Sequence, residues 1–287
     1  MDWKPKHASA AWLAIAIASS SLALFFGTGL HPHWWLTWLM PFSVLLLAGR
    51  LSARGAFLAG MASWCLGSLN TWTFLRSVLE VPLFPVIAFM LLPSCVFGLG
   101  ILLFRRWVKG GNLAAAALGF SAFWVSFEYL VAKTSIHGTY GNLAYSQMDF
   151  LPIVQIATLT GGWGISFLVL LPASTIAALW SGFGTSHQKS ILATAVTIFL
   201  LAIMGFGEWR LHAVPNDGAL VRVGLLASDL PENTLPTQPE DAQRLMREYA
   251  VQARSLLKQG AQVVVAPEKI VVVQEENIKA QIGRAHV

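Results

Sequence analysis

The sequence predicts a multi-pass α-helical membrane bundle followed by the start of an α/β domain. First, 55% of the 287 residues are hydrophobic and only 11% are charged, whereas soluble domains carry about 25% charged residues. So few charges cannot cover a water-exposed surface of this size. Second, long apolar runs fill residues 1–209, and a strand–helix–strand pattern follows them.

Seven apolar runs are candidate membrane spans, because a bilayer core of ~30 Å requires about 20 mostly apolar residues per helix. We interpret the first as an uncleaved span, since no cleavage site followed by polar sequence comes after it. Phe150–Leu159 either lies on the membrane surface or begins the sixth span. The predicted spans are Ala8–Phe26, Trp34–Ala48, Gly55–Leu75, Val81–Phe104, Leu113–Ala132, Gly161–Trp180 and Ser190–Gly207.

The loop charges predict the orientation of these spans. With loops counted from the N-terminus, eight basic residues fall on one side before Arg210 and two on the other. Positive charge accumulates on the cytoplasmic side. We therefore expect a cytoplasmic N-terminus and an extracytoplasmic segment after Gly207. The eight are Lys4, Lys6, Arg50, Arg54, Arg105, Arg106, Lys109 and Lys189, and the two are Arg76 and Lys133.

The region after Trp209 predicts one β–α–β unit. Val221–Ala227 and Gln262–Ala266 are candidate strands, and Glu240–Gln259 has an apolar face at helical spacing. Pro231–Pro239 is a proline-rich loop, and Gly260 suits the helix C-terminus. A parallel, right-handed unit is expected.

The net charge of +5 does not indicate nucleic-acid binding, because most basic residues lie in short loops where they set topology. Cys65 and Cys95 lie inside apolar runs without metal-ligand spacing, and His31 and His33 lack a third ligand nearby. We therefore expect no metal site, no disulfide framework and no cofactor. The two histidines precede Trp34, which begins an interfacial aromatic belt.

Three segments resemble the apolipoprotein N-acyltransferase family, a membrane branch of the nitrilase (carbon–nitrogen hydrolase) superfamily. Trp124–Leu130, Gly141–Gln147 and Gln155–Leu168 are similar to its late-helix signature, and the β–α–β unit ending in Pro267 and Glu268 is similar to its first catalytic motif. The resemblance implies an α-β-β-α sandwich for the second domain. We expect boundaries at 1–209 for the membrane domain and 210–281 for the first part of the nitrilase-like domain.

The resemblance implies a catalytic Glu, Lys and Cys, of which this chain contains only the Glu. Glu268 would be the general base that removes the thiol proton, since a thiol is mostly protonated at neutral pH. Lys269 does not match the family lysine, and neither Cys65 nor Cys95 matches the nucleophile. Taken by themselves, Pro267 and Glu268 support a catalytic role only weakly, because many strands end in Pro-Glu.

Four further residues are candidates for substrate binding. Glu128, near a helix end in the membrane, either handles lipid or peptide or reaches the interface with Lys133 as its partner. Asn142, Tyr145 and Gln147 form a polar cluster in the following loop. They could line a lipid headgroup site, or serve capping and turn roles.

The resemblance implies an acyltransferase of the bacterial inner membrane, and a monomer. An acyl chain would move from a phospholipid to a Cys thioester and then to the N-terminal amine of a diacylglyceryl lipoprotein. A membrane-tethered amidase and a non-enzymatic transporter or scaffold remain alternatives. We interpret the chain as C-terminally truncated and inactive by itself, and residues 282–287 as a non-native tail.

The orientation can be tested with a reporter enzyme that is active only outside the cytoplasm. We expect activity when it is fused after Asp217 and none when it is fused after Gly110, because the eight-to-two division of basic residues places these positions on opposite sides. The reverse pattern would overturn the topology.

Overall fold

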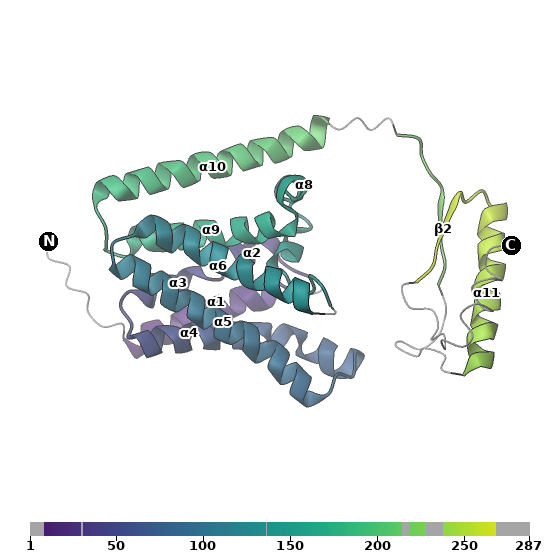
Figure 1. The fold of residues 1–287 in the computed structure, drawn as a ribbon, viewed down its shortest axis with the longest axis horizontal. Helices are drawn as coiled ribbons and strands as arrows, with labels where there is room; N and C mark the ends of the chain where they lie inside the picture. Colours follow the sequence, from purple (N-terminus) through teal and green to yellow (C-terminus); the bar gives the residue numbers. More distant parts are fainter. Residues whose placement is uncertain (1–8, 30, 136, 214–217, 228–237, 268–287) are drawn as a thin grey trace. The chain divides into compact units, whose positions relative to one another are not determined.

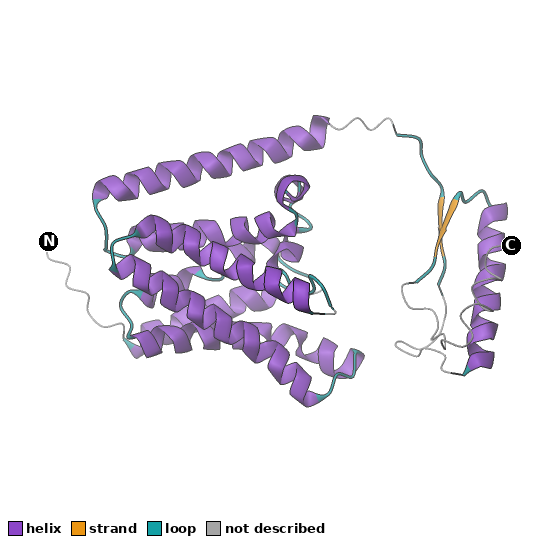
Figure 2. Ribbon diagram, in the orientation of Figure 1, coloured by secondary structure: helices purple, strands orange, loops and turns teal. Residues whose placement is uncertain are grey.

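A computed structural model describes residues 9–29, 31–135, 137–213, 218–227 and 238–267 of the chain. It divides into two compact units, Met1–Val214 and Pro215–Val287. The first is helical and the second contains both strands (Figures 1 and 2). Residues 214–217, most of the proline-rich segment predicted as a loop (residues 228–237), Glu268 and the predicted non-native tail 282–287 lie outside the described residues.

Five helices in the described part of the chain are long and apolar enough to cross a membrane. They coincide with five of the seven predicted spans, and no membrane-spanning window in them exceeds two charged residues. The chain is therefore a multi-pass helical membrane protein. These helices are α1 (Ala10–Gly27), α5 (Leu83–Lys109), α6 (Leu113–Thr134), α9 (Gly162–Trp180) and α10 (Ser186–Ala213).

The second predicted span is not one continuous helix. It forms α2 (Trp34–Leu39) and α3 (Phe42–Ala48), separated by Met40 and Pro41. Proline has no backbone N–H and clashes with the preceding turn, so a helix rarely runs through it unbroken. The Ser20 hydroxyl donates to the Met40 carbonyl at the break.

The third predicted span is also irregular, since its α-helix ends earlier than Leu75. After α4 (Ala53–Gly67) the chain continues through a 3₁₀ turn, η1 (Ser68–Thr71), and a π turn, η2 (Phe74–Val78). Within η1, Asn70 Nδ2 donates to the Phe25 carbonyl at 3.0 Å and to Thr28 Oγ1 at 2.9 Å. The chain therefore loses regular α geometry at the point where the Asn70 side chain bonds to the end of α1.

Three short helices connect α6 to α9. They are η3 (Leu143–Gln147), α7 (Leu151–Val154) and α8 (Ala157–Thr160). Gly161, with φ of +63°, separates α8 from α9. Phe150–Leu159 is therefore distinct from the sixth predicted span, Gly161–Trp180, whose helix α9 begins at Gly162. Non-helical backbone within a membrane protein requires partners other than lipid, and the site described below supplies them.

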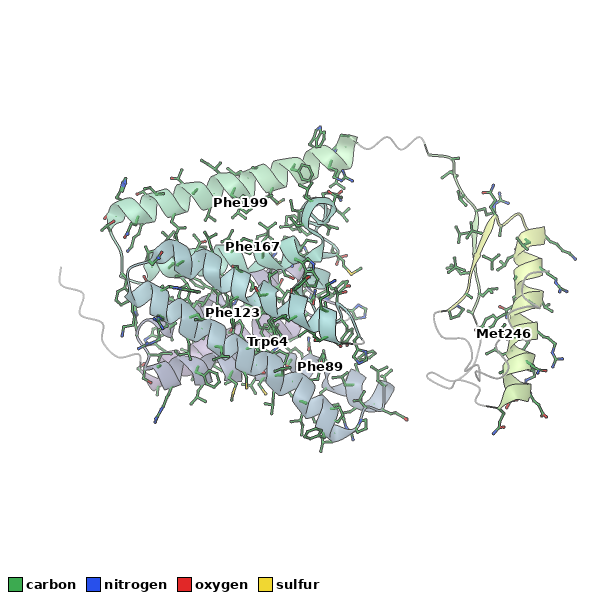
Figure 3. All side chains as sticks on the ribbon, viewed as in Figure 1. Trp64, Phe89, Phe123, Phe167, Phe199 and Met246 are labelled. Atoms are coloured by element: carbon green, nitrogen blue, oxygen red, sulfur yellow. The ribbon has the colours of Figure 1, made fainter. Side chains whose placement is uncertain are left out.

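The core of the bundle consists of closely packed aromatic rings and a contact between glycines. Trp64 and Trp124 have ring centroids 4.1 Å apart, and Phe97 lies 5.1 Å from Trp64 (Figure 3 labels Trp64). A Cβ atom on Gly60 would lie 3.0 Å from the Gly98 Cα, so α4 and α5 approach closely there. Small residues permit such helix contacts in membranes.

The second unit is a parallel β–α–β arrangement. Strands β1 (Val223–Leu225) and β2 (Val263–Val265) pair in parallel, and α11 (Pro239–Lys258) connects them. Both strands are shorter than predicted. The apolar face of α11 buries Ala242, Leu245 and Tyr249, and Gly260 has the positive φ of +91° expected after a helix C-terminus.

Candidate functional site

The candidate site is a layer of buried polar side chains at the end of the bundle where α6 ends. The C-terminal part of α6 carries Glu128, and η3 follows it after a short turn. Ser166 of α9 and Thr37 of α2 complete the layer, and both are fully buried. Four elements that are distant in the sequence therefore contribute to one polar cluster among apolar helices.

The Glu128 carboxylate connects α6 to the loop that follows it through hydrogen bonds. Its Oε1 accepts hydrogen bonds from Trp124 Nε1 at 3.0 Å and from the Leu143 backbone N–H at 2.8 Å. The side chain is 3% exposed. The Ser166 hydroxyl is the other polar group beside the carboxylate, and among the described residues Oε2 has no hydrogen bond of normal geometry.

The predicted pairing of Glu128 with Lys133 at the membrane interface is wrong. The Lys133 ammonium lies over the Tyr129 ring, 5.6 Å from its centroid, and the Glu128 carboxylate points into the protein. The reason is local: Trp124 precedes Glu128 by four residues, so both lie on the same face of α6. That face packs against the core, which draws the carboxylate inward.

Gln147 is fully buried, and its amide joins η3 to α2. Its Oε1 accepts from Trp38 Nε1 at 2.7 Å, while Nε2 lies 2.8 Å from Thr37 Oγ1 and 3.0 Å from the Trp34 carbonyl. A third oxygen, Ser146 Oγ, is 2.8 Å from Nε2. All of the amide's bonding capacity is directed inward, so Gln147 supports the site from within.

Asn142 and Tyr145 have different surroundings from Gln147. Asn142 precedes η3 and is 7% exposed, and its side chain caps none of the described backbone N–H groups of η3. Tyr145 is 51% exposed, and its hydroxyl lies 2.6 Å from Thr139 Oγ1. Of the predicted binding residues, Tyr145 is therefore the one most accessible from outside.

Sequence reasoning missed Trp124, Thr37 and Ser166 as members of the layer. Ser166 Oγ accepts from the Ala144 backbone N–H at 3.1 Å, and Thr37 Oγ1 lies 3.1 Å from Ser146 Oγ. The four-residue spacing of Trp124 and Glu128 was a visible signal. Thr37 gave none, because its partners come more than 100 residues later in the chain.

The described residues contain no group of three or more His, Cys, Asp or Glu side chains that could hold a metal ion. Cys65 and Cys95 are free thiols within α4 and α5. Glu268, the predicted general base, lies outside the described residues, although Pro267 just before it is described. The structure therefore brings Glu128, Asn142 and Gln147 together. The role of Glu268 is inferred from the sequence alone.

These features define the class: a multi-pass membrane protein whose helices enclose a polar layer at one end. Comparison with known proteins identifies the family. Residues 20–175 match the family model described as the apolipoprotein N-acyltransferase N-terminal domain. This range includes every residue of the polar layer. The chain belongs to the apolipoprotein N-acyltransferase family, whose members are lipoprotein N-acyltransferases.

Curated relatives are consistent with this assignment. The chain is 28% identical over 238 residues to apolipoprotein N-acyltransferase of Geobacter metallireducens, with 77% of this chain and 44% of that protein covered. It is 27% identical over 227 residues to that of Nitrosomonas europaea, with 77% and 42% covered. For Shewanella oneidensis the values are 25% over 284 residues, with 96% and 49% covered. The chain spans about half the length of these relatives.

Replacing Glu128 tests whether the carboxylate holds the loop. In Glu128→Ala the buried Trp124 and Leu143 donors lose their acceptor, which should cost about 1–3 kcal/mol for each unsatisfied group. Glu128→Gln keeps an oxygen at the Oε1 position and should remain within about 1 kcal/mol of the unsubstituted chain. Thermal unfolding of the purified chain in detergent measures both.

A suitable control is Ser126→Ala on the same helix, because Ser126 is exposed and its hydroxyl donates to the Ala122 carbonyl within α6. This variant should unfold at the unsubstituted temperature. If Glu128→Ala were as stable as Ser126→Ala, the two hydrogen bonds would not be what fixes the loop.

Gln147 and Tyr145 should differ strongly in their effect on stability. Gln147→Leu leaves the Trp38 indole N–H without its acceptor and removes the amide bonds to Thr37 and Ser146, which should cost about 2 kcal/mol or more. Tyr145→Phe removes one exposed hydroxyl and should stay within about 0.5 kcal/mol. Thermal unfolding, together with protease sensitivity of residues 137–150, compares the two. Equal sensitivity in both variants would contradict a structural role for Gln147.

Proposed function

We propose that the full-length protein containing this chain transfers an acyl chain from a membrane phospholipid to the N-terminal amine of a diacylglyceryl lipoprotein. The observation that carries the proposal is the family match over residues 20–175, which includes the buried layer at the end of the bundle. In this proposal the chain supplies the membrane bundle and the first β–α–β unit of a nitrilase-like catalytic domain.

A membrane bundle suits this reaction because both substrates carry acyl chains that keep them in the bilayer. Restricting two reactants to one surface and orienting them removes much of the entropic cost of bringing them together. Five helices long and apolar enough to span the bilayer would keep the enzyme in the same membrane as both substrates. A soluble enzyme would have to extract each substrate from the membrane.

The parallel strand pair supports a catalytic role for Glu268. β2 ends at Val265, and Glu268 follows three residues later. Ligands of open parallel sheets bind beyond the C-terminal ends of the strands. The match to the Shewanella oneidensis protein covers 96% of this chain, and therefore also includes the segment around Glu268.

The proposed reaction has two steps. Glu268 takes the proton of a cysteine thiol, and the thiolate attacks the phospholipid ester carbonyl. The ester C–O bond then breaks, and the leaving oxygen takes the proton back from Glu268 to give a lysophospholipid. A lysine stabilises the oxyanion of the intermediate. In the second step the lipoprotein amine attacks the thioester, the C–S bond breaks and an amide forms. The lysine and the cysteine are proposed to lie in sequence beyond this chain.

The polar layer has a supporting part in this proposal. Tyr145 and Asn142 border the loop that Glu128 and Gln147 fix, and their polar atoms could meet a lipid headgroup at the membrane surface. Tyr and similar amphipathic side chains favour this depth of the bilayer. With the N-terminus in the cytoplasm, this end of the bundle would face the extracytoplasmic side.

Glu268→Gln in the full-length protein tests the catalytic assignment. The amide keeps the shape of the carboxylate but cannot accept a proton. General-base catalysis contributes about 10²–10⁴-fold, and the loss should lie near the upper end because the base also generates the nucleophile. The measurement is thioester formation on the enzyme with labelled phospholipid, alongside thermal stability.

Glu248→Gln is the matched control, because Glu248 is an exposed acid on α11 and should keep full thioester formation. The 287-residue chain by itself should form no thioester. Near-normal thioester formation by Glu268→Gln would remove Glu268 from the reaction, and with it the residue on which the proposed mechanism depends.

A further inference from the structure

A groove separates α10 from the rest of the bundle at the end opposite the polar layer. Its walls are apolar and come from α6, α9 and α10, with Leu118, Leu171, Ala195 and Phe199 among the lining residues, and its volume is about 410 Å³. Figure 1 shows α10 running beside the bundle, and Figure 3 labels Phe199 on it. Among the described residues of α10 only Leu192, Val196 and Gly207 are buried.

The dimensions of the groove fit the acyl chain of a lipid within one leaflet. It extends along α10 from Gln188 to Phe199, which is about 16 Å at 1.5 Å per residue. Half of a bilayer core of ~30 Å is about 15 Å. Because α10 is a membrane-spanning candidate, the groove opens towards lipid. An acyl chain can enter it without leaving the hydrocarbon phase.

Two amide side chains stand at the polar end of the groove, and both present donors. Asn112 Oδ1 accepts from the Ala115 N–H at 3.0 Å, and Gln188 Oε1 accepts from the Thr185 N–H at 2.9 Å. Both residues line the groove. Because the carbonyl oxygens are occupied by these backbone bonds, the NH₂ groups are the parts available to a ligand. Donors of this kind match the phosphate and ester oxygens of a phospholipid.

The charges around this end favour a headgroup with net negative charge. Lys109 ends α5 three residues before Asn112, and Lys189 follows Gln188 directly. The stretches 105–115 and 181–190 contain no Asp or Glu. In the part of the chain that the structure describes, neither lysine forms an ion pair with an acidic side chain.

We propose that this groove binds one phospholipid with an anionic headgroup, with an acyl chain along α10 and the phosphate at Asn112 and Gln188. The site is separate from the proposed transfer reaction. Asn112 precedes α6 and Glu128 lies near its other end, so the two are about 24 Å apart along the helix. The bound lipid fills the space between α10 and the bundle and stabilises that contact.

The proposal is tested on the 287-residue chain in detergent, with palmitoyl-oleoyl phosphatidylglycerol as the anionic probe and the matching phosphatidylcholine as the neutral one. Native mass spectrometry counts the lipids retained, and thermal unfolding measures the stabilisation that binding confers. We expect one retained phosphatidylglycerol and little phosphatidylcholine. Lys109→Gln and Lys189→Gln should each weaken retention about fivefold, from the attraction of one cation for an anionic headgroup.

Matched variants separate the groove from ordinary surrounding lipid. Ala195→Trp fills the groove and should abolish retention, whereas Ile198→Trp, at a 62% exposed position outside the lining, should not. Arg54→Gln on α4, across the bundle from α10 (Figure 1), is the charge control. Equal retention of both lipids, or the same result for Ala195→Trp and Ile198→Trp, would overturn the proposal. So would displacement of the lipid by oleyl alcohol at equal concentration, since an uncharged single chain would then bind as well and the anionic headgroup would contribute nothing.

Discussion

The fold depends on satisfying backbone groups where the chain leaves helical geometry at the end of α6. An unpaired N–H or carbonyl in a medium without water costs several kcal/mol. Glu128 accepts from the Leu143 N–H, Ser166 from the Ala144 N–H, and Gln147 donates to the Trp34 carbonyl. Side chains from α6, α9 and η3 thus complete the hydrogen bonding of two irregular segments. A non-helical surface can then exist at the end of a helical bundle.

The position of the second half of α10 follows from this arrangement. Trp34 and Trp38, which Gln147 orients, stand with Phe150 and Ile153 around an apolar pocket of about 290 Å³ that Ile203 also lines. Farther along, a Cβ atom on Gly207 would collide with the Pro152 carbonyl, so α10 and α7 approach there as closely as a glycine permits. Helix α10 therefore packs closely against the bundle at the end where the polar layer lies. The chain continues from this end of α10 to the second unit.

Hydropathy and periodicity predicted the helices and strands whose formation depends on residues close together in the sequence. The five long spans, α11 and the two parallel strands follow from such local patterns, and so does the positive φ of Gly260. The break at Pro41 was visible as well, but the surrounding apolar run outweighed it. Only part of the environment of Glu128 could be predicted, because Trp124 lies four residues before it but its second donor, Leu143, comes fifteen residues later. For Gln147 the sequence leaves a headgroup site and capping or turn roles equally open, since nothing near it in the sequence reveals its bond to the Trp38 indole.

The polar side chains at the two ends of the bundle are satisfied in different ways. At the end of α6 the polar groups are buried and bonded to one another, so that end of the bundle can hold a fixed shape. At the start of α6 the polar groups are exposed donors beside lysines, so in our proposal that end obtains its final partner from the membrane. The substrates and the structural lipid then belong to different leaflets. In these two proposals together, a change in the lipids of one leaflet would alter how firmly α10 is held without changing the supply of acyl donor in the other.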